Sequence, residues 1–245
     1  MIPFLFLLAS AIPAAPDTAS YQATLKRFVT DDGKVRYADL RNNLSGLSEF
    51  VAGIAQVSPD SHPALFPGKD AKLAYWVNTY NALVLHAFAS EYPLNKTRLR
   101  NKVGQFTFFY RRKFKVGGVE RSLDDIESKS IRTIDNRIHF SIVCASASCP
   151  WLSNEVFVPE KLNQQLDARA RLFLNQERNV RLDPTRNIIY LSKIFDWFKK
   201  DFGNSDSAVL QYIANYRNKD GDRLRKSGLK IQYMDYDWSL NELLP

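Results

Sequence analysis

A long apolar segment from about Asp70 to Glu91 constrains the fold of this chain more than any other feature. Its large side chains recur at helical spacing over most of a helix circumference, at Leu73, Trp76, Val77, Tyr80, Leu83, Val84, Ala87 and Phe88. Other elements must cover a helix that is apolar on most of its sides. The spacing therefore predicts a long buried helix with the remainder of the chain packed around it.

The flanking segments predict a single α+β domain, which suits a length of 245 residues. Further helices are expected over residues 20–57, from Pro159 to about Gln176, and over 194–202 and 206–217. Short strands and hairpins are expected at 106–116 with a turn at Gly117–Gly118, at 138–144, at 180–182 with 188–191, and at 229–234. The residues from Ser122 to Asp125 have the pattern of a helix capping box.

The N-terminus predicts export. Residues 1–16 carry no charged side chain, and residues 4–9 form an apolar run between two prolines. This run is too short and too interrupted to span a bilayer, whereas a signal peptide has this pattern. We therefore expect residues 1–16 to be a signal peptide and residues 17–69 to be a mostly helical N-terminal segment. The mature chain would be periplasmic or secreted, with no transmembrane helix.

The positive charge of the chain is confined to one stretch. Lysines and arginines outnumber acids 34 to 26, and the eight basic residues between Tyr92 and Val119, a stretch without any acid, account for the whole excess. Aromatic residues interleave with this run around Arg111, Arg112 and Lys113, which are candidate binding residues. Their partner would be an anionic envelope component or an acidic protein, because export disfavours nucleic acid. The alternative is a half-buried hairpin whose aromatic residues face inward and whose cations face solvent.

The sequence lacks the common signatures of nucleotide, zinc-protease and serine-hydrolase sites, so no cofactor is expected. A strand over residues 138–144 would place His139 and Cys144 on opposite faces. Cys149, in the loop beyond, is therefore the candidate nucleophile, with His139 as its base and Asn78 as the group that orients the imidazole.

A structural disulfide between Cys144 and Cys149 is the competing interpretation, since an exported protein folds in an oxidising compartment. No metal site is expected, because His139 and the two cysteines lack a fourth ligand and match no common zinc spacing.

Asn78 and Asn81 lie three residues apart on the apolar helix, and therefore on one side of it. A buried amide needs hydrogen-bond partners, so we expect this pair to clamp a loop through its backbone groups. The alternative is that the pair lines a polar pocket, in which Asn81 would be a binding residue. Asn81 and Asp237 are also alternatives to Asn78 for orienting His139.

Five blocks of distinctive residues follow one another along the chain: Tyr75–Leu83 with the pattern WxNxYNAL, Ser122–Glu127, Arg137–Leu152 with its Ser-Cys-Pro, Ile194–Phe198 with Asp201–Phe202, and Tyr236–Asn241. In this order they resemble the domain of unknown function 547 family. The resemblance implies that residues 70–245 form this family's domain, with a fold that is distantly papain-like or transglutaminase-like by analogy. This chain departs from the family at Ser128, where a histidine is usual.

Two functions follow as hypotheses. The first is an exported cell-envelope hydrolase or transferase that uses a thiol on amide or peptide-like bonds. The second is a non-catalytic envelope binding domain with a Cys144–Cys149 disulfide and a basic docking hairpin. The sequence leaves open whether the protein is an enzyme.

Overall fold

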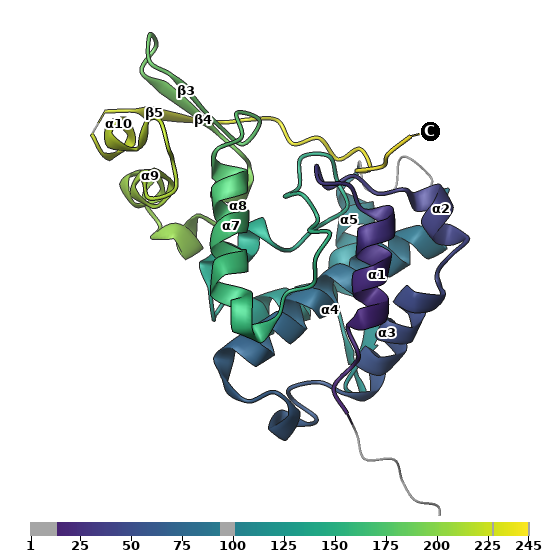
Figure 1. The fold of residues 1–245 in the computed structure, drawn as a ribbon. Coiled ribbons are helices and arrows are strands. Elements are labelled where there is room, and N and C mark those ends of the chain that lie inside the picture. Colours follow the sequence, from purple (N-terminus) through teal and green to yellow (C-terminus); the bar gives the residue numbers. More distant parts are fainter. Residues whose placement is uncertain (1–13, 94–100, 227, 245) are drawn as a thin grey trace, which may run out of the picture.

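The helix α4 (Gly68–Ser90) runs through the middle of the fold (Figure 1). The computed structural model describes residues 14–93, 101–226 and 228–244, so the predicted signal peptide lies almost wholly outside the described residues. Buried side chains of α4 point to every side of the helix, among them Trp76, Tyr80 and Phe88. The prediction of a long buried helix is therefore confirmed. Within the described ranges, no helix is long and apolar enough to cross a membrane.

Three helices of the N-terminal segment lie on one side of α4, where the second and third pack against it and the first packs on the third (Figure 1). They are α1 (Ala19–Phe28), α2 (Tyr37–Arg41) and α3 (Ser45–Gln56), followed by the short turn η1 (Pro63–Leu65). The rings of Tyr21 and Phe50 stack at 4.8 Å between α1 and α3. Most residues of this segment are helical in the structure.

The basic stretch folds differently from the predicted hairpin. Residues 106–110 are helical, because α5 (Lys102–Phe106) continues into η2 (Thr107–Arg111). The hairpin lies after them, as β1 (Phe114–Val116) and β2 (Val119–Arg121), and it turns at Gly117–Gly118 as expected. The predicted capping box is present at the start of α6 (Leu123–Ile126), which continues into η3 (Glu127–Ile131).

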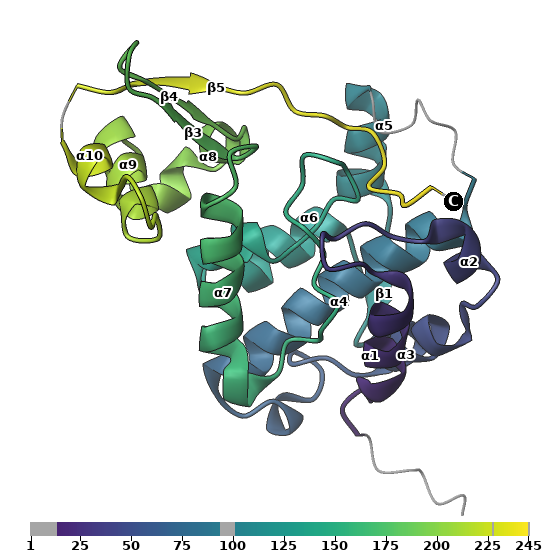
Figure 2. The same ribbon diagram turned by 45° about the horizontal axis from the view of Figure 1, so that its top comes forward.

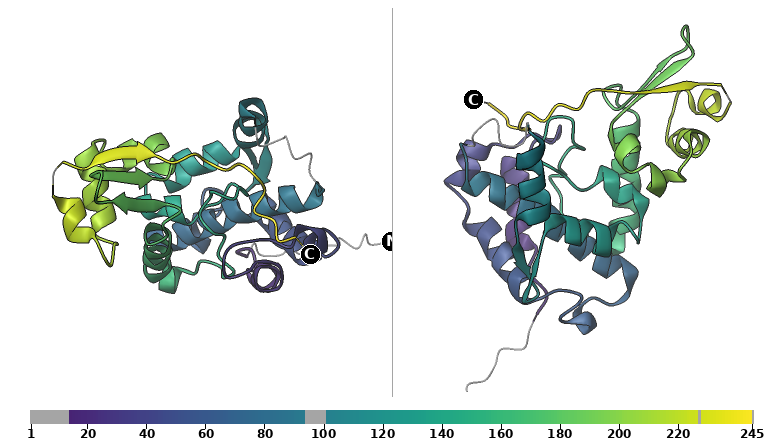
Figure 3. Two further views of the ribbon diagram at one scale, coloured as in Figure 1. Left: turned by 90° about the horizontal axis from the view of Figure 1, so that it is seen from above. Right: turned by 180° about the vertical axis from the view of Figure 1, so that it is seen from behind.

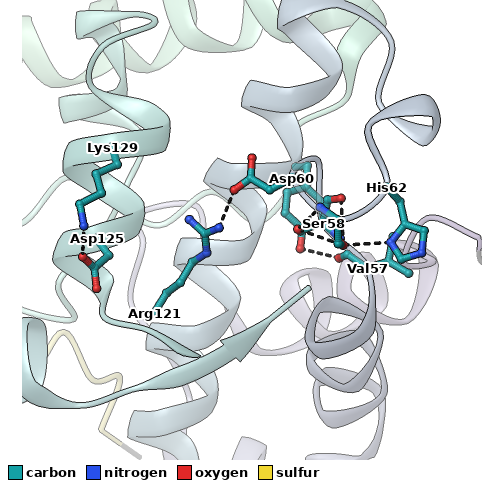
Figure 4. Close-up of polar contacts among 9 residues, drawn as sticks. Val57, Ser58, Asp60, His62, Arg121, Asp125 and Lys129 are labelled. Carbon is teal, nitrogen blue, oxygen red and sulfur yellow. Dashed lines mark hydrogen bonds and ion pairs between the residues drawn. The ribbon is translucent and has the colours of Figure 1, made fainter. Parts of the chain in front are cut away.

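The hairpin turn packs against the C-terminal end of α3. The backbone N–H groups of Gly117 and Gly118 donate to the carbonyls of Ile54 and Ala55 at 2.9 and 2.8 Å. Around this junction, Ser61 Oγ lies 2.9 Å from His62 Nδ1, and Arg121 pairs with Asp60 at 2.6 Å (Figure 4). The turn is therefore an internal packing element.

Replacing Gly117 with alanine is expected to lower the free energy of unfolding by about 2–4 kcal/mol. Gly117 has φ +58°, and an added Cβ would lie 2.1 Å from Ser58 Oγ. Gly118→Ala is the matched control, because its φ is +84° but no atom lies within 4 Å of an added Cβ. Urea denaturation of both variants measures the difference, and equal losses would show that the contact with Ser58 is unimportant.

The predicted strand at 138–144 is wrong. Residues Asn136–Phe140 form the short helix η4, capped by the Asp135 side chain, which accepts the Arg137 N–H at 2.9 Å. Beyond η4, the side chain of Asn81 hydrogen-bonds the Val143 N–H and the Ser141 carbonyl, the backbone groups that a sheet ladder would otherwise use. The chain is thus held as a loop.

The C-terminal part forms a second apolar cluster beside the first. The elements of this C-terminal part are η5 (Pro159–Lys161), α7 (Leu162–Leu174), β3 (Val180–Asp183), β4 (Ile188–Leu191), α8 (Ile194–Trp197), η6 (Lys199–Phe202), α9 (Asp206–Ala214), α10 (Gly221–Arg225) and β5 (Lys230–Tyr233). β4 pairs antiparallel with β3 and parallel with β5, with Val180 opposite Leu191 and Ile189 opposite Ile231. The helix α10 was not expected. The α+β class is confirmed.

The segment after β5 returns to the N-terminal helices and ties the fold together (Figures 1 and 2). Val35 N–H donates to the Asn241 carbonyl, and Leu243 N–H donates to the Val35 carbonyl, both at 2.9 Å. The Tyr37 hydroxyl donates to Asn241 Oδ1 at 2.9 Å. On its way this segment crosses the loop that carries both cysteines.

Candidate functional site

The loop from Val143 to Pro150 is fixed from three directions. Asn81 on α4 holds its start. The returning C-terminal segment binds its middle, where Ala147 N–H donates to the Ser239 carbonyl at 2.7 Å. Arg178 holds its end by donating to the carbonyls of Ala147 at 2.6 Å and Cys149 at 2.8 Å. A loop held on this many sides can keep a side chain in a defined position.

Ala145 adopts the left-handed backbone conformation, with φ +61°. Residues other than glycine adopt it at a cost of about 1–3 kcal/mol, and only where the surroundings impose it. Here the strained residue directly follows Cys144. Because such strain is concentrated at functional sites, the backbone conformation of Ala145 makes the neighbouring Cys144 a candidate functional residue.

The Cys144 sulfur lies among hydrogen-bond donors. Ser146 Oγ is 3.0 Å and Tyr236 Oη is 3.3 Å from Cys144 Sγ, and Ser146 Oγ lies 3.2 Å from Tyr236 Oη. Burial raises the pKa of the Cys144 thiol, but hydrogen bonds from Cys149, the Ser146 hydroxyl and backbone, and Tyr236 outweigh it and lower the pKa to about 7. About half of the Cys144 side chains are therefore thiolates at neutral pH.

Cys149 has the opposite character. It is 5% exposed, and its sulfur accepts the backbone N–H of Cys144 at 2.9 Å. Burial, together with the hydrogen bond to Cys144 and the charge on it, raises the pKa of the Cys149 thiol well above its usual range. Of the two thiols, Cys144 is thus the better nucleophile. Both are free thiols in this structure, so the Cys144–Cys149 disulfide stays a prediction.

Glu127 is a second titratable group, and the charge on Cys144 acts on it. The Tyr80 hydroxyl on α4 donates to Glu127 Oε2 at 3.3 Å. Burial raises the pKa of this carboxyl to about 7, against the opposing effects of Arg132 and Tyr80, and the charge on Cys144 raises it further. A carboxyl group with this pKa can both donate and accept a proton at neutral pH.

Replacing Glu127 with glutamine changes the free energy of unfolding relative to the native chain, and this change is expected to be more favourable at pH 8 than at pH 5 by about 1–3 kcal/mol. The folded pKa lies above the ordinary value of 4.5, so the buried carboxyl favours folding while protonated and loses this contribution as pH rises from about 4.5 through 7. Glutamine stays neutral and still accepts the Tyr80 hydrogen bond. Unfolding free energies of both proteins at the two pH values test this, and identical pH dependence would contradict it.

An aromatic cluster adjoins the thiol. The ring of Tyr236, whose hydroxyl lies at Cys144, is 4.8 Å from the ring of Trp197 and 4.7 Å from that of Trp238. Trp197 is 48% exposed, although a tryptophan is normally well covered. The cluster therefore presents an open ring surface beside Cys144.

His139 is hydrogen-bonded to Asp201. Its Nε2 is 2.7 Å from Asp201 Oδ2, its ring stacks on Phe198 at 4.2 Å, and Asp201 also receives a bidentate pair of hydrogen bonds from Arg132. Burial lowers the pKa of His139 to about 4, so the ring is neutral at pH 7. Among the described residues, no hydrogen bond joins His139 to Cys144 or Cys149.

Asn78 and Asn81 act as backbone clamps, the first of the two roles that the sequence suggested. Asn78 bonds both backbone groups of Phe157, donating to its carbonyl at 2.8 Å and accepting its N–H at 2.9 Å. Asn81 donates to the Ser141 carbonyl at 2.9 Å and accepts the Val143 N–H at 3.0 Å. Asn78 thus does not orient His139, whose partner is Asp201.

The basic candidates make mostly internal contacts. Arg112 pairs with Glu91 at 2.5 Å, and Lys113 pairs with Asp125 at 3.0 Å. Asp125 also pairs with Lys129 at 2.6 Å (Figure 4). The exposed Arg111 lies over the ring of Phe106.

The sequence favoured Cys149 as the candidate nucleophile, and it did not indicate Ser146, Tyr236, Glu127 and Tyr80 as groups that interact around Cys144. The one sequence signal for Tyr236 was its place in the last block of the family resemblance. Ser128, at the position where the family usually has histidine, donates to the Asp124 carbonyl of its own helix at 2.7 Å.

The comparisons with known proteins identify a family and nothing further. The model of the family described as "Protein of unknown function, DUF547" matches residues 65–174, which include α4, Glu127 and both cysteines. Tyr236 and the aromatic cluster lie beyond this match. No curated protein and no solved structure matches the chain, so the papain-like or transglutaminase-like analogy stays a prediction. Residues 65–174 of the chain are thus similar to the DUF547 family of proteins of unknown function.

Proposed function

We propose that the protein is a thiol-dependent hydrolase or transferase acting on amide or peptide-like bonds, with Cys144 as the nucleophile. The observation that carries the proposal is the set of hydroxyl and thiol donors around Cys144 Sγ, from Ser146, Tyr236 and Cys149. Donors of this kind stabilise a thiolate without a neighbouring imidazole. The proposal accordingly places the nucleophile on Cys144, where the sequence favoured Cys149.

In the proposed reaction, the Cys144 thiolate attacks the carbonyl carbon and forms a carbon–sulfur bond. The bond to the leaving group breaks, and the leaving amine or alcohol takes a proton from the Glu127 carboxyl group. The Glu127 carboxylate then removes a proton from water or from an acceptor amine, which attacks the thioester and releases Cys144 as a thiolate. A pKa of about 7 suits Glu127 to both steps.

The aromatic cluster of Trp197, Tyr236 and Trp238 is the proposed surface on which the substrate rests. The exposed ring of Trp197 can stack on a flat or apolar group. The hydroxyl of Tyr236, whose ring belongs to the cluster, contacts Cys144 Sγ. Binding there would hold the reacting carbonyl near the thiolate.

The proposal is tested with p-nitrophenyl acetate as an acyl donor. We expect a burst of p-nitrophenolate equal to the protein concentration, and a single acetyl group on Cys144 in the intact mass and the peptide map. Cys144→Ala should abolish both signals. Cys149→Ala should keep the acetyl group on Cys144.

Glu127→Gln should form the thioester but hydrolyse it at least about tenfold more slowly, because the proton acceptor for water is lost. Acetylation that maps to lysines, or a burst that persists in Cys144→Ala, would contradict the proposal. In that event the non-catalytic envelope domain would be favoured. Intact mass after alkylation with and without reduction would then show whether its two cysteines form a disulfide.

We propose in addition that the protein is exported through residues 1–16 and works in the periplasm or outside the cell. The apolar, uncharged N-terminal run supports this. N-terminal sequencing of the mature protein should find a start near Ala15, and a chain that retains Met1 would contradict export. An anionic envelope component or an acidic protein remains the proposed partner of Arg111, Arg112 and Lys113.

A further inference from the structure

The helical segment Lys102–Arg111, formed by α5 and η2, lies at the edge of the fold (Figures 2 and 3). Its start is fixed by Asn101, whose side chain accepts the Gly104 N–H at 2.7 Å. One side of the segment packs inward through Phe108, which is 2% exposed and meets the ring of Phe88 on α4 at 4.9 Å. The segment is thus anchored along one side.

The opposite side exposes large apolar groups to solvent. Val103 is 75% exposed, Phe106 48% and Tyr110 51%, and the rings of Phe106 and Tyr110 stack at 5.3 Å. Spacings of three and four residues place the three side chains on one face of a helix. Few other large apolar side chains of the described chain are comparably exposed, and these three lie together. An apolar face of this kind marks an interaction surface.

Cations border this face. The Arg111 guanidinium lies 5.5 Å from the centre of the Phe106 ring, and Lys113 and Lys115 are exposed beyond it. The sequence contains no acid from Tyr92 to Val119. Of the neighbouring acids, Glu91 pairs with Arg112, and Asp125 pairs with Lys113 and Lys129. Asp124 and Glu127 act electrostatically on Tyr110, and Glu120 stands opposite Lys115 in the hairpin, so Arg111 is the cation most directly available beside the face.

We propose that the face formed by Val103, Phe106 and Tyr110 docks the protein onto an anionic lipid membrane, with the three side chains entering the boundary between headgroups and acyl chains. Aliphatic and aromatic groups on one helix face, bordered by Lys and Arg, have the composition of interfacial membrane-binding helices. The cations account for a preference for anionic headgroups. The apolar face accounts for binding that persists when salt screens the charges. A soluble acidic partner would use the cations but leave Val103 in water.

Sedimentation with lipid vesicles tests the proposal. The full chain should bind vesicles containing about one quarter phosphatidylglycerol in phosphatidylcholine, and bind pure phosphatidylcholine at least about tenfold more weakly. The double variant Val103→Ser with Phe106→Ser should lose at least about tenfold in binding. Val119→Ser is the matched control, because Val119 is 54% exposed but lies on the hairpin β1–β2, and it should bind as the native chain does. Circular dichroism establishes that each variant is folded.

Depth of insertion separates lipid docking from simple attraction between charges. In Phe106→Trp, fluorescence quenching by brominated lipids should increase over that of the native chain, whereas Val119→Trp should show no increase. Absence of vesicle binding, equal binding by the double variant, or equal quenching in the two tryptophan variants would each overturn the proposal. Binding to soluble polyglutamate that depends on Arg111 but not on Val103 would favour an acidic protein partner instead.

Discussion

Cys144 is expected to react with iodoacetamide with a midpoint near pH 7, and at least about tenfold faster at neutral pH than Cys149 in the same protein. The difference arises because hydroxyl and thiol donors stabilise the charge on Cys144, whereas Cys149 is buried and keeps its proton. The rate is measured as a function of pH by peptide mapping, which assigns each alkyl group to one cysteine. Faster reaction of Cys149 would contradict the assignment of the nucleophile.

Tyr236→Phe tests directly whether the Tyr236 hydroxyl stabilises the Cys144 thiolate. It removes one hydroxyl, 3.3 Å from Cys144 Sγ, and keeps the ring that packs against Trp197 and Trp238. The pKa of Cys144 should rise by about 1 unit, since a hydrogen bond to a charged group contributes about 1.5–3 kcal/mol. Tyr233→Phe is the control, because its ring contacts Lys193 and it should leave the reactivity of Cys144 unchanged. An unchanged midpoint in Tyr236→Phe would show that the hydroxyl does not stabilise the thiolate.

Asn81→Ala is expected to lower the free energy of unfolding by about 2–5 kcal/mol. The substitution leaves the Val143 N–H and the Ser141 carbonyl without their partner in a buried position, and each such group costs about 1–3 kcal/mol. Urea denaturation measures the loss. Asn43→Ala is the matched control, since the Asn43 side chain donates to the Asp39 carbonyl at the exposed end of α2 and should contribute less than about 1 kcal/mol.

The same variant should also slow the alkylation of Cys144 in the folded protein, because Val143 fixes the start of the cysteine loop. This readout separates positioning of the loop from stability, since a stabilising osmolyte restores folding but not the lost hydrogen bonds. Normal reactivity of Cys144 in folded Asn81→Ala would show that the remaining contacts suffice to hold the loop.

The elements that sequence predicted correctly are those whose signals are local or repeated. The periodicity from Leu73 to Phe88 continues over many turns, so α4 could be recognised without knowledge of its neighbours. The capping box at Ser122 and the turn at Gly117–Gly118 are signals within four residues of chain.

The errors arose where distant contacts decide the conformation. A short apolar run such as residues 138–144 is compatible with a strand or a buried helical turn, and here the side chain of Asn81 on another element decides it. The preference for Cys149 over Cys144 rested on that expected strand, whereas the proposal made above favours Cys144. The contact between Cys144 and Tyr236 joins residues 92 positions apart, which spacing alone could not reveal.

The crossing of the cysteine loop by the returning C-terminal segment has a consequence for the biogenesis of the protein. Until Tyr236 has been synthesised and docked, Cys144 lacks one of its donors and is closer to an ordinary thiol. We therefore expect the pKa of Cys144 to fall to about 7 only once this segment has docked. Thiol reactivity at neutral pH would then serve as a direct assay of correct folding, more specific than any global probe.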